Sequence, residues 1–196
     1  MYIKYIKRII DLILVLLAIP FFLVFYIVFA ILIKIEDNGP VFYKAERIGK
    51  NNKIFKMYKF RSMKVNAPNI LNPDGSTYNA KNDPRVTKIG KFLRENSLDE
   101  IPQILNIIKG EMSIIGPRAS LAGALGTFKK DEVDKMKVLP GITGFTQAYF
   151  RNDLPNREKR LKDAWYANNV SLCLDLKILS KTISTIVKRK GIYSNV

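Results

Sequence analysis

The feature that most restricts this chain is an apolar segment near its N-terminus, LILVLLAIPFFLVFYIVFAILI, from Leu12 to Ile33, which contains no charged residue. At about 1.5 Å per residue, a helix of this length reaches across the roughly 30 Å hydrocarbon core of a bilayer. A cleaved signal peptide has a shorter apolar core followed by small residues, whereas KIEDNGPVFY follows here. We therefore predict a retained membrane anchor over residues 1–37.

The topology of this anchor depends on Pro20, in the middle of the segment. Proline removes one helical hydrogen bond and clashes with the preceding turn, which predicts a bend or a break. Basic residues lie before the segment and after it, and the positive-inside rule then favours a re-entrant helix-break-helix with both ends in the cytoplasm. An ordinary spanning helix with a proline kink is the alternative, because membrane helices tolerate proline. The residues alone leave both topologies open.

Composition limits what the rest of the chain can do. The 196 residues suffice for one domain, residues 38–196, beside the anchor. A formal charge of +16 predicts an anionic partner: nucleic acid, anionic lipid or a phosphorylated substrate. Histidine is absent from the sequence, which excludes the commonest general base and the commonest zinc ligand. The single cysteine, Cys173, excludes an internal disulfide and is predicted to be a buried small hydrophobe.

The order of patterns after the anchor predicts an α+β domain. Two apolar-aromatic runs around the Asn-rich turn 49–52 predict a β-hairpin, and 64–87, rich in Asn, Pro, Asp and Gly, predicts a long loop. Further elements are predicted as follows: a helix from Ser97 that Gly110 stops, a buried strand at MSIIG, a turn-rich connection at LPGITGF, a polar helix over Arg157–Asn168 and an amphipathic helix over Asp175–Lys190. With a membrane anchor on the same chain, the last helix either closes the core or lies in the headgroup plane as an interfacial helix.

Two adjacent carboxylates, Asp99 and Glu100, stand at the start of the helix predicted from Ser97. Ser97 and Glu100 have the spacing of a capping box, and acidic residues in a first helical turn need no chemistry to explain them. A helix N-terminus is also a site for phosphate, and adjacent carboxylates beside cations suit a pair in which one binds Mg²⁺ and the other attacks phosphorus. These residues alone therefore predict a cap, or a membrane-embedded enzyme or binder acting on phosphorylated ligands.

The chain resembles a known family, the small monotopic phosphoglycosyl transferases or bacterial sugar transferases. The resemblance covers nearly the whole chain and rests on the order and spacing of several stretches: KRIIDLILVLLAIPFF, GPVFYKAERIG, FKMYKFRSM, DPRVTKIGKFLRENSLDEIPQILNIIKGEMSIIGPR, LPGITGFTQ and YANNVSLCLDLKIL. It departs from the family at two positions. Ala119 stands where a proline usually follows Arg118, and Ile19 stands where a serine often precedes the helix-breaking proline.

The resemblance implies a reaction: transfer of a sugar phosphate from a UDP-sugar to a polyprenyl phosphate, with release of UMP, as the first membrane step of surface glycan assembly. It implies that Asp99 is the nucleophile, forming a covalent aspartyl phosphosugar, and that Glu100 helps to hold Mg²⁺. It places the family's substrate-binding positions on Lys59, Arg94, Arg118 and Asp175. It also implies a re-entrant anchor broken at Pro20, in the bacterial cytoplasmic membrane, with the catalytic domain on the cytoplasmic face.

Two rival functions belong to other classes. A membrane-bound phosphohydrolase would use the same carboxylates with a different acceptor. A non-catalytic basic module would bind anionic lipid or nucleic acid, but nucleic-acid binding is not expected, because the aromatic residues gather in the anchor and the hairpin. Sugar specificity is predicted to lie in the 64–87 loop and in Gln147–Asn156, which contain no readable sugar code. The oligomeric state is not readable from the sequence either.

Overall fold

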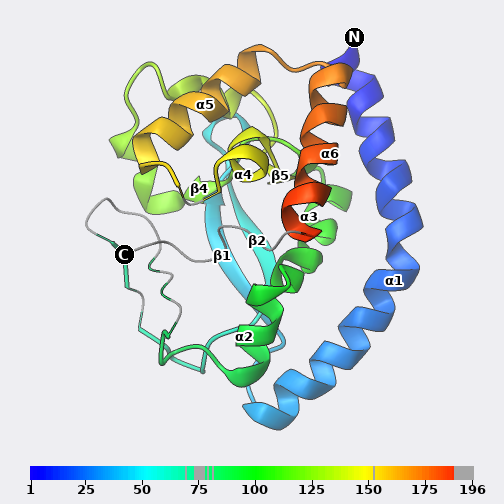
Figure 1. Ribbon diagram of the computed structural model, residues 1–196, viewed down its shortest axis with the longest axis vertical. Coiled ribbons are helices and arrows are strands. Elements are labelled where there is room, and N and C mark those ends of the chain that lie inside the picture. Colours follow the sequence, from blue (N-terminus) through cyan, green and yellow to red (C-terminus); the bar gives the residue numbers. More distant parts are fainter. Residues whose placement is uncertain (69, 73–77, 79, 81, 152, 188–196) are drawn as a thin grey trace.

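The computed structural model describes residues 1–68, 70–72, 78, 80, 82–151 and 153–187. Within these residues the fold combines helices with two small sheets, as the sequence predicts. The longest element, α1 (Lys7–Glu36), follows a π-helical turn and runs along one side of the domain (Figure 1). Among the described residues, Tyr2–Glu36 is one helix that is long and apolar enough to cross a membrane.

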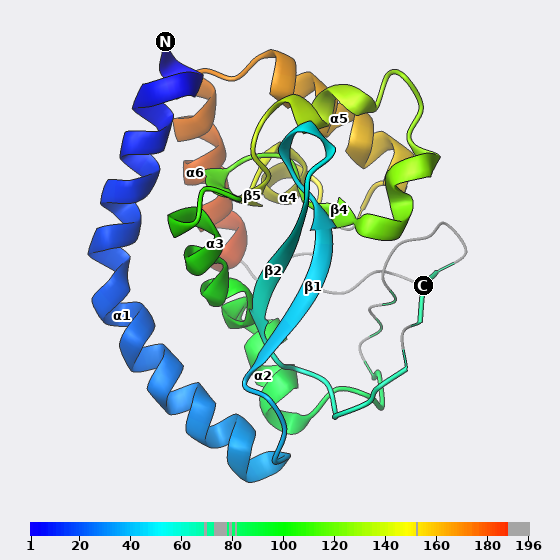
Figure 2. The ribbon, with the colours of Figure 1, turned by 180° about the vertical axis from the view of Figure 1, so that it is seen from behind.

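The predicted break at Pro20 is not shown, because α1 continues through this residue as one helix. In two opposite views α1 follows an arc whose concave side faces the domain (Figures 1 and 2). A stripe of side chains on α1 is buried: Asp11, Val15, Phe22, Phe29 and Ile33. Because both halves of α1 pack on the same surface, the hydrogen bond missing at Pro20 is accommodated without interrupting the helix. Large apolar side chains outside the stripe remain exposed, such as Leu16 and Phe21.

Both ends of α1 are bonded to the domain. Near the N-terminal end, Lys7 Nζ lies 2.6 Å from a carboxylate oxygen of Asp175, in α6 (Leu172–Val187). At the C-terminal end, the Glu36 carboxylate accepts hydrogen bonds from the first two amides of α2 (Lys88–Glu95), at 2.6 and 2.9 Å. The whole length of α1 therefore lies against the domain.

The predicted hairpin is confirmed. Strands β1 (Phe42–Ile48) and β2 (Ile54–Phe60) pair antiparallel, and β4 (Ser120–Leu121) extends this sheet beside β1 (Figure 2). The turn places Asn51 and Asn52 at positive φ, which asparagine tolerates better than most residues.

A second sheet pairs β3 (Ser113–Ile115) with β5 (Gly141–Thr143) in parallel. The strand predicted at MSIIG is confirmed as β3. Strand β5 was predicted only as a turn-rich connection, because it is three residues long and has Pro and Gly around it. A Cβ at Gly141 would lie 2.1 Å from the amide nitrogen of Gly116, so this close pairing requires glycine.

The segment with the two carboxylates is helical, but only its second half is α-helical. Leu98–Gln103 forms a 3₁₀ helix that contains Pro102, and α3 (Ile104–Ile108) follows it. Gly110 adopts φ +79° after α3, as expected for a helix stop. The predicted Ser97 cap is wrong: Ser97 lies in the left-handed region, at φ 56°, and its side chain makes no capping hydrogen bond. Helix α2, which precedes this segment, was not predicted.

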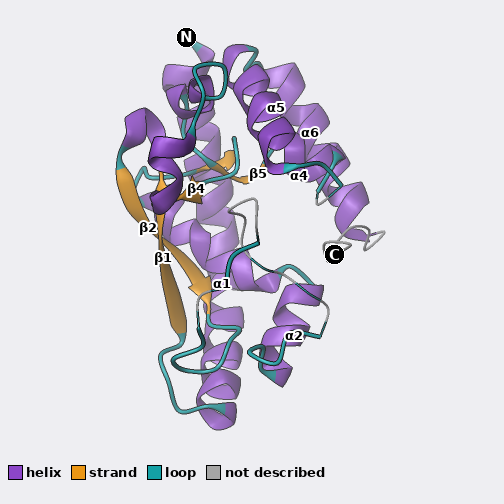
Figure 3. Ribbon diagram, turned by 90° about the vertical axis from the view of Figure 1, so that its left-hand side faces the viewer, coloured by secondary structure: helices purple, strands orange, loops and turns teal. Residues whose placement is uncertain are grey.

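Three helices pack with the second sheet in one core: α4 (Phe145–Tyr149), α5 (Asn156–Asn168) and α6. A 3₁₀ helix at Ala122–Thr127 contacts β1 and β4, and another at Val133–Lys137 contacts α5. The hairpin lies on one side of the molecule and α4, α5 and α6 on the other (Figure 3). One core cluster joins α1, β2 and α3, and another joins β3, α4, α5 and α6. The polar helix is confirmed as α5, and α6 confirms the amphipathic helix as far as Val187. Its predicted end at 188–190 lies outside the described residues, as do 69, 73–77, 79 and 81 of the predicted loop.

Candidate active site

Asp99 and Glu100 lie in the first turn of the 3₁₀ helix, facing the end of β2. The link to β2 is direct, because the fully buried side chain of Asn106 in α3 bonds to β2. It accepts from the amide of Tyr58 at 2.9 Å and donates to the carbonyl of Lys56 at 2.8 Å. The hairpin and the carboxylate segment are therefore held in register.

Two of the predicted cations contact the carboxylates. Lys59 Nζ, near the end of β2, lies 2.5 Å from Glu100 Oε1 and 3.6 Å from Asp99 Oδ2. Arg118, in the turn between β3 and β4, places Nη2 3.6 Å from the same Glu100 oxygen. The Arg118 side chain is 58% exposed, whereas those of Asp99 and Lys59 are 13% and 16% exposed. The site is therefore a largely buried carboxylate pair with an arginine at its open side.

The two carboxylates differ electrostatically. Burial raises the pKa of Asp99 above its usual value, because it penalises the charged form, and the charge of Glu100 adds to this. The cations around Asp99 act in the opposite sense, but they do not outweigh burial. Burial acts on Glu100 in the same sense, but Lys59 and Arg118 outweigh it and lower the Glu100 pKa to about 2. Glu100 is thus the carboxylate that the cations hold ionised.

Arg94 also acts on this pair, though from α2. Its Nε donates to Ser62 Oγ at 2.9 Å, and its positive charge offsets part of the rise in the Asp99 pKa. Lys59, Arg94 and Arg118 therefore act together on the two carboxylates, and their role in substrate binding stays a prediction.

Arg47, on β1, is a cation near this site that the sequence analysis did not single out. The Arg47 Nε is buried and has no hydrogen-bonding partner among the described residues. Burial, followed by repulsion from Arg118, lowers the Arg47 pKa to about 10. A small pocket lies between this guanidinium and Glu100, lined by Arg47, Met57, Glu100, Gln103, Arg118, Ala119, Gly141 and Ile142. An arginine alternating with apolar residues on a strand gives no sequence signal of such a position.

Arg151 is a second missed cation. It lies at φ 44° after α4, and its charge interacts with that of Glu100. Burial lowers its pKa. It belongs to Gln147–Asn156, the stretch predicted to carry sugar specificity, of which residue 152 lies outside the described residues.

Asp175 lies in a different polar cluster. Its Oδ1 accepts from the Tyr166 hydroxyl, and its Oδ2 accepts from the Tyr2 hydroxyl and from Lys7 Nζ, all at 2.6 Å. The carboxylate is 3% exposed. These contacts fasten the start of the anchor to α6, and a role for Asp175 in substrate binding stays a prediction.

The expectation that Cys173 is buried is wrong, because it is exposed on α6. It lines an open hollow along this helix with Tyr149, Leu172, Leu176, Lys177, Ser180, Lys181 and Ser184. Exposed apolar side chains and lysines thus share one face of α6, which explains why an apolar sequence run did not mean burial.

Asp99 and Glu100 are the side chains of this site that could bind Mg²⁺. The described residues contain no group of three or more acidic, cysteine or histidine side chains that could hold an ion. Mg²⁺ usually takes one or two carboxylates and completes its shell with water and substrate phosphate. Asp99 and Glu100 fit that kind of shared site, and they do not fit a site made by protein ligands alone.

The family model described as bacterial sugar transferase matches residues 2–189. An uncharacterized sugar transferase of Haemophilus influenzae is 37% identical over 97% of this chain, which spans 42% of that protein. The exopolysaccharide production protein ExoY of Rhizobium meliloti is 38% identical over 95% of this chain, which spans 88% of it.

An undecaprenyl-phosphate galactose phosphotransferase of Salmonella typhimurium is 37% identical over 81% of this chain. The chain spans 36% of that protein, so it corresponds to less than half the length of several relatives. The match to the family model nevertheless extends over almost all of the chain, including both carboxylates and the cations around them. The chain therefore belongs to the bacterial sugar transferase family.

Proposed function

We propose that this protein is a polyprenyl-phosphate phosphoglycosyl transferase that moves a sugar phosphate from a UDP-sugar to a polyprenyl phosphate. The observation that carries the proposal is the pair Asp99–Glu100 among cations, at the surface of a domain fastened to an apolar helix. Four cations outnumber the two carboxylates, so net positive charge remains to bind a diphosphate. These cations are Lys59, Arg94, Arg118 and Arg47. The names of the relatives, which include sugar phosphotransferases that use undecaprenyl phosphate, support the same reaction class.

The proposed chemistry has two displacements. In the first, a carboxylate oxygen of Asp99 attacks the phosphorus that carries the sugar, the bond between that phosphorus and the bridging oxygen breaks, and UMP leaves. In the second, a phosphate oxygen of the polyprenyl phosphate attacks the same phosphorus and displaces Asp99, which gives a polyprenyl-diphosphate sugar. Dividing the transfer in this way lets one cationic site serve a soluble donor and a lipid acceptor in turn.

The side chains have distinct roles in this proposal. Lys59 and Arg118 neutralise the diphosphate, and Arg118 can hold two oxygens of one phosphate because its guanidinium is forked. Glu100, beside Asp99, would hold Mg²⁺, which when bound supplies a positive charge that screens the phosphate oxygens. Arg118→Lys keeps the charge but loses the fork, and should lose most activity while remaining folded.

We also propose that the anchor is monotopic, with both ends on the cytoplasmic face. A helix that crossed the bilayer would separate its ends, whereas Lys7 and Glu36 both bond to the same domain. The curvature of α1 and its exposed apolar faces suit insertion into one side of the bilayer. The exposed leucines and lysines of α6 suit an interfacial position beside it.

The reaction is tested by incubating the purified protein with UDP-sugars and Mg²⁺, without polyprenyl phosphate. We expect release of at most about one UMP per enzyme and an adduct of one sugar phosphate, detected by mass spectrometry. Asp99→Asn should abolish the adduct, because an amide is a far poorer nucleophile. Persistence of the adduct in this variant would refute Asp99 as nucleophile. Continuous UMP release without acceptor would favour a phosphohydrolase, and no release with any donor would favour a binding module.

The topology is tested with single cysteines at Tyr2 and Asn38 in a Cys173→Ala background. In intact cells an impermeant thiol reagent should label neither position, and in permeabilised cells it should label both. Labelling of Tyr2 alone in intact cells would show that the segment spans the membrane.

A further inference from the structure

A buried ion pair lies behind Arg118. Lys135, in the 3₁₀ helix Val133–Lys137, places Nζ 3.0 Å from Asp163 Oδ2 in α5, and the two side chains are 6% and 2% exposed. Burying two charges carries a desolvation cost that their attraction often fails to offset. Stability is therefore a weak reason for such a pair, and the groups that it bonds indicate its use.

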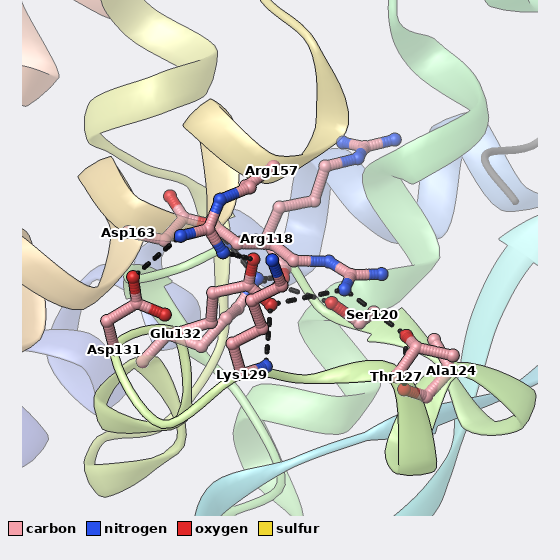
Figure 4. A network of polar contacts seen from close by, with 11 residues as sticks. Arg118, Ser120, Ala124, Thr127, Lys129, Asp131, Glu132, Arg157 and Asp163 are labelled. Carbon is pink, nitrogen blue, oxygen red and sulfur yellow. Dashed lines mark hydrogen bonds and ion pairs between the residues drawn. The ribbon is translucent and has the colours of Figure 1, made fainter. Parts of the chain in front are cut away.

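The pair bonds to the backbone of Arg118 on both sides. The Arg118 amide donates to Asp163 Oδ2 at 3.2 Å, and Lys135 Nζ donates to the Arg118 carbonyl at 3.0 Å and to Ser120 Oγ at 3.3 Å. The other Asp163 oxygen accepts from the Thr146 hydroxyl. Figure 4 shows Arg118, Ser120 and Asp163 gathered in this network.

The preceding residue is fixed as well, because the Pro117 carbonyl accepts from the amide of Gly141 at 3.0 Å. Three successive polar groups of the turn are thus held by different elements. The side chain of Arg118, in contrast, is mostly exposed, and its described ion pair is the 3.6 Å approach to Glu100. The direction of the Arg118 side chain is therefore set mainly by the hydrogen bonds that hold its backbone.

We propose that Lys135 and Asp163 are positioning residues that aim Arg118 at the phosphate of the substrate. Ala119 carries no ring that would fix the backbone after Arg118, so the hydrogen bonds from Lys135 and Asp163 supply the restriction. The inference rests on the proposed function, because it takes Arg118 as a phosphate-binding residue. It adds two residues that touch no substrate and act through Arg118.

The test is a double-mutant cycle, which separates action through Arg118 from loss of folding. Lys135→Met and Asp163→Asn are each made in the wild-type and in the Arg118→Ala background, and UMP release is measured in the presence of acceptor. In the wild-type background we expect kcat/KM to fall roughly 10- to 100-fold, as for misplacement of a binding group by about 1 Å. In the Arg118→Ala background we expect less than about a twofold further loss, because there is no guanidinium left to aim.

A second measurement does not need turnover. Inorganic pyrophosphate should raise the melting temperature of the wild type, and either positioning variant should lose most of this shift. In the Arg118→Ala background, these variants should cause no further loss. Lys135→Arg, which keeps the charge and the donors, should retain more of the shift than Lys135→Met.

A matched control lies in the same network. Glu132 is buried and pairs with Arg157 at 2.8 Å and with Arg160 at 3.3 Å, so it joins the same two parts of the fold without a described bond to the 117–120 turn (Figure 4). Glu132→Gln should lower the melting temperature while leaving kcat/KM and the pyrophosphate shift of the folded protein within about twofold of wild type.

Equal losses in both Arg118 backgrounds would overturn the inference and leave the transferase proposal standing. Failure of the wild type to bind pyrophosphate would overturn the inference as well, because Arg118 would then have no phosphate to be aimed at. Absence of UMP release from a wild type that binds pyrophosphate through Arg118 would contradict the proposed function alone.

Discussion

Replacing Glu100 by glutamine should destabilise the protein at neutral pH, and replacing Asp99 by asparagine should not. Burial acts to raise the Glu100 pKa, but Lys59 and Arg118 lower it from 4.5 to about 2. This difference corresponds to about 3 kcal/mol of folding free energy, since one pKa unit is equivalent to about 1.4 kcal/mol. That value is an upper limit, because the Glu100 side chain is 20% exposed and Lys59 can turn to Asp99, 3.6 Å away. We expect a loss of about 1–3 kcal/mol for Glu100→Gln.

For a chain of this size, that loss corresponds to a fall in melting temperature of roughly 2–12 °C. Its pH dependence has a definite sign. A carboxylate with a lowered pKa in the folded state stabilises fully above its unfolded pKa of 4.5, and this stabilisation is lost as the pH falls toward about 2. The melting temperatures of wild type and Glu100→Gln should therefore differ most above about pH 5, and the difference should shrink as the pH falls from about 4.5 to about 2.

Asp99→Asn should leave the melting temperature unchanged or raise it. Burial raises the pKa of Asp99, so its charged form costs folding free energy at neutral pH, and an amide of the same shape removes that cost. Melting is followed by intrinsic fluorescence in lipid nanodiscs, with Glu158→Gln on α5, an exposed carboxylate, as the control. Equal melting of Glu100→Gln and wild type at about pH 7, or a difference at about pH 2 as large as that at about pH 7, would refute the ion-pair argument.

Three further variants test other parts of the fold and site. Asn106→Ala leaves three hydrogen-bonding groups without their partner, so it should lower the free energy of unfolding by about 2–4 kcal/mol, measured by chemical denaturation. An unchanged value would mean that Asn106 does not hold the hairpin to α3. Arg47→Gln should raise KM for the UDP-sugar at least about tenfold without lowering the melting temperature, and an unchanged KM would return Arg47 to a structural role. Asp175→Asn should lower the free energy of unfolding by roughly 3 kcal/mol and speed tryptic cleavage after Lys7, because it breaks the buried Lys7–Asp175 pair. Cleavage at the wild-type rate would show that other contacts hold the N-terminal turn.

Local sequence patterns predicted much of the secondary structure. The hairpin around Asn51, the strand MSIIG and the helices α5 and α6 follow from alternation, turn residues and helical periodicity, all of which act over a few residues. The apolar anchor is equally local, since twenty consecutive apolar residues have few alternatives to a helix. These elements could be placed before any tertiary contact was known.

Predictions that depend on neighbours in space were less successful. Ser97 does not cap the helix, because its backbone turns into the left-handed region and Pro102 favours a 3₁₀ helix over an α-helix. Cys173 is exposed although its neighbours in the sequence are apolar, because that face of α6 is not covered by the described part of the domain. The pKa of Asp99 is raised although cations surround it, because burial is a property of the folded site that the sequence does not show.

The sequence by itself determined the long apolar N-terminal helix, the α+β elements, and the carboxylates and cations of the candidate site, through local pattern and the order of motifs. Only the tertiary structure decided which cations reach Glu100, since Lys59 and Arg118 come from distant parts of the chain. It alone brought Arg47 to the pocket and the Lys135–Asp163 pair to the backbone of Arg118. The physical reason is that sequence spacing fixes directions along one helix or strand, whereas contact, burial and charge interaction depend on how separate elements pack.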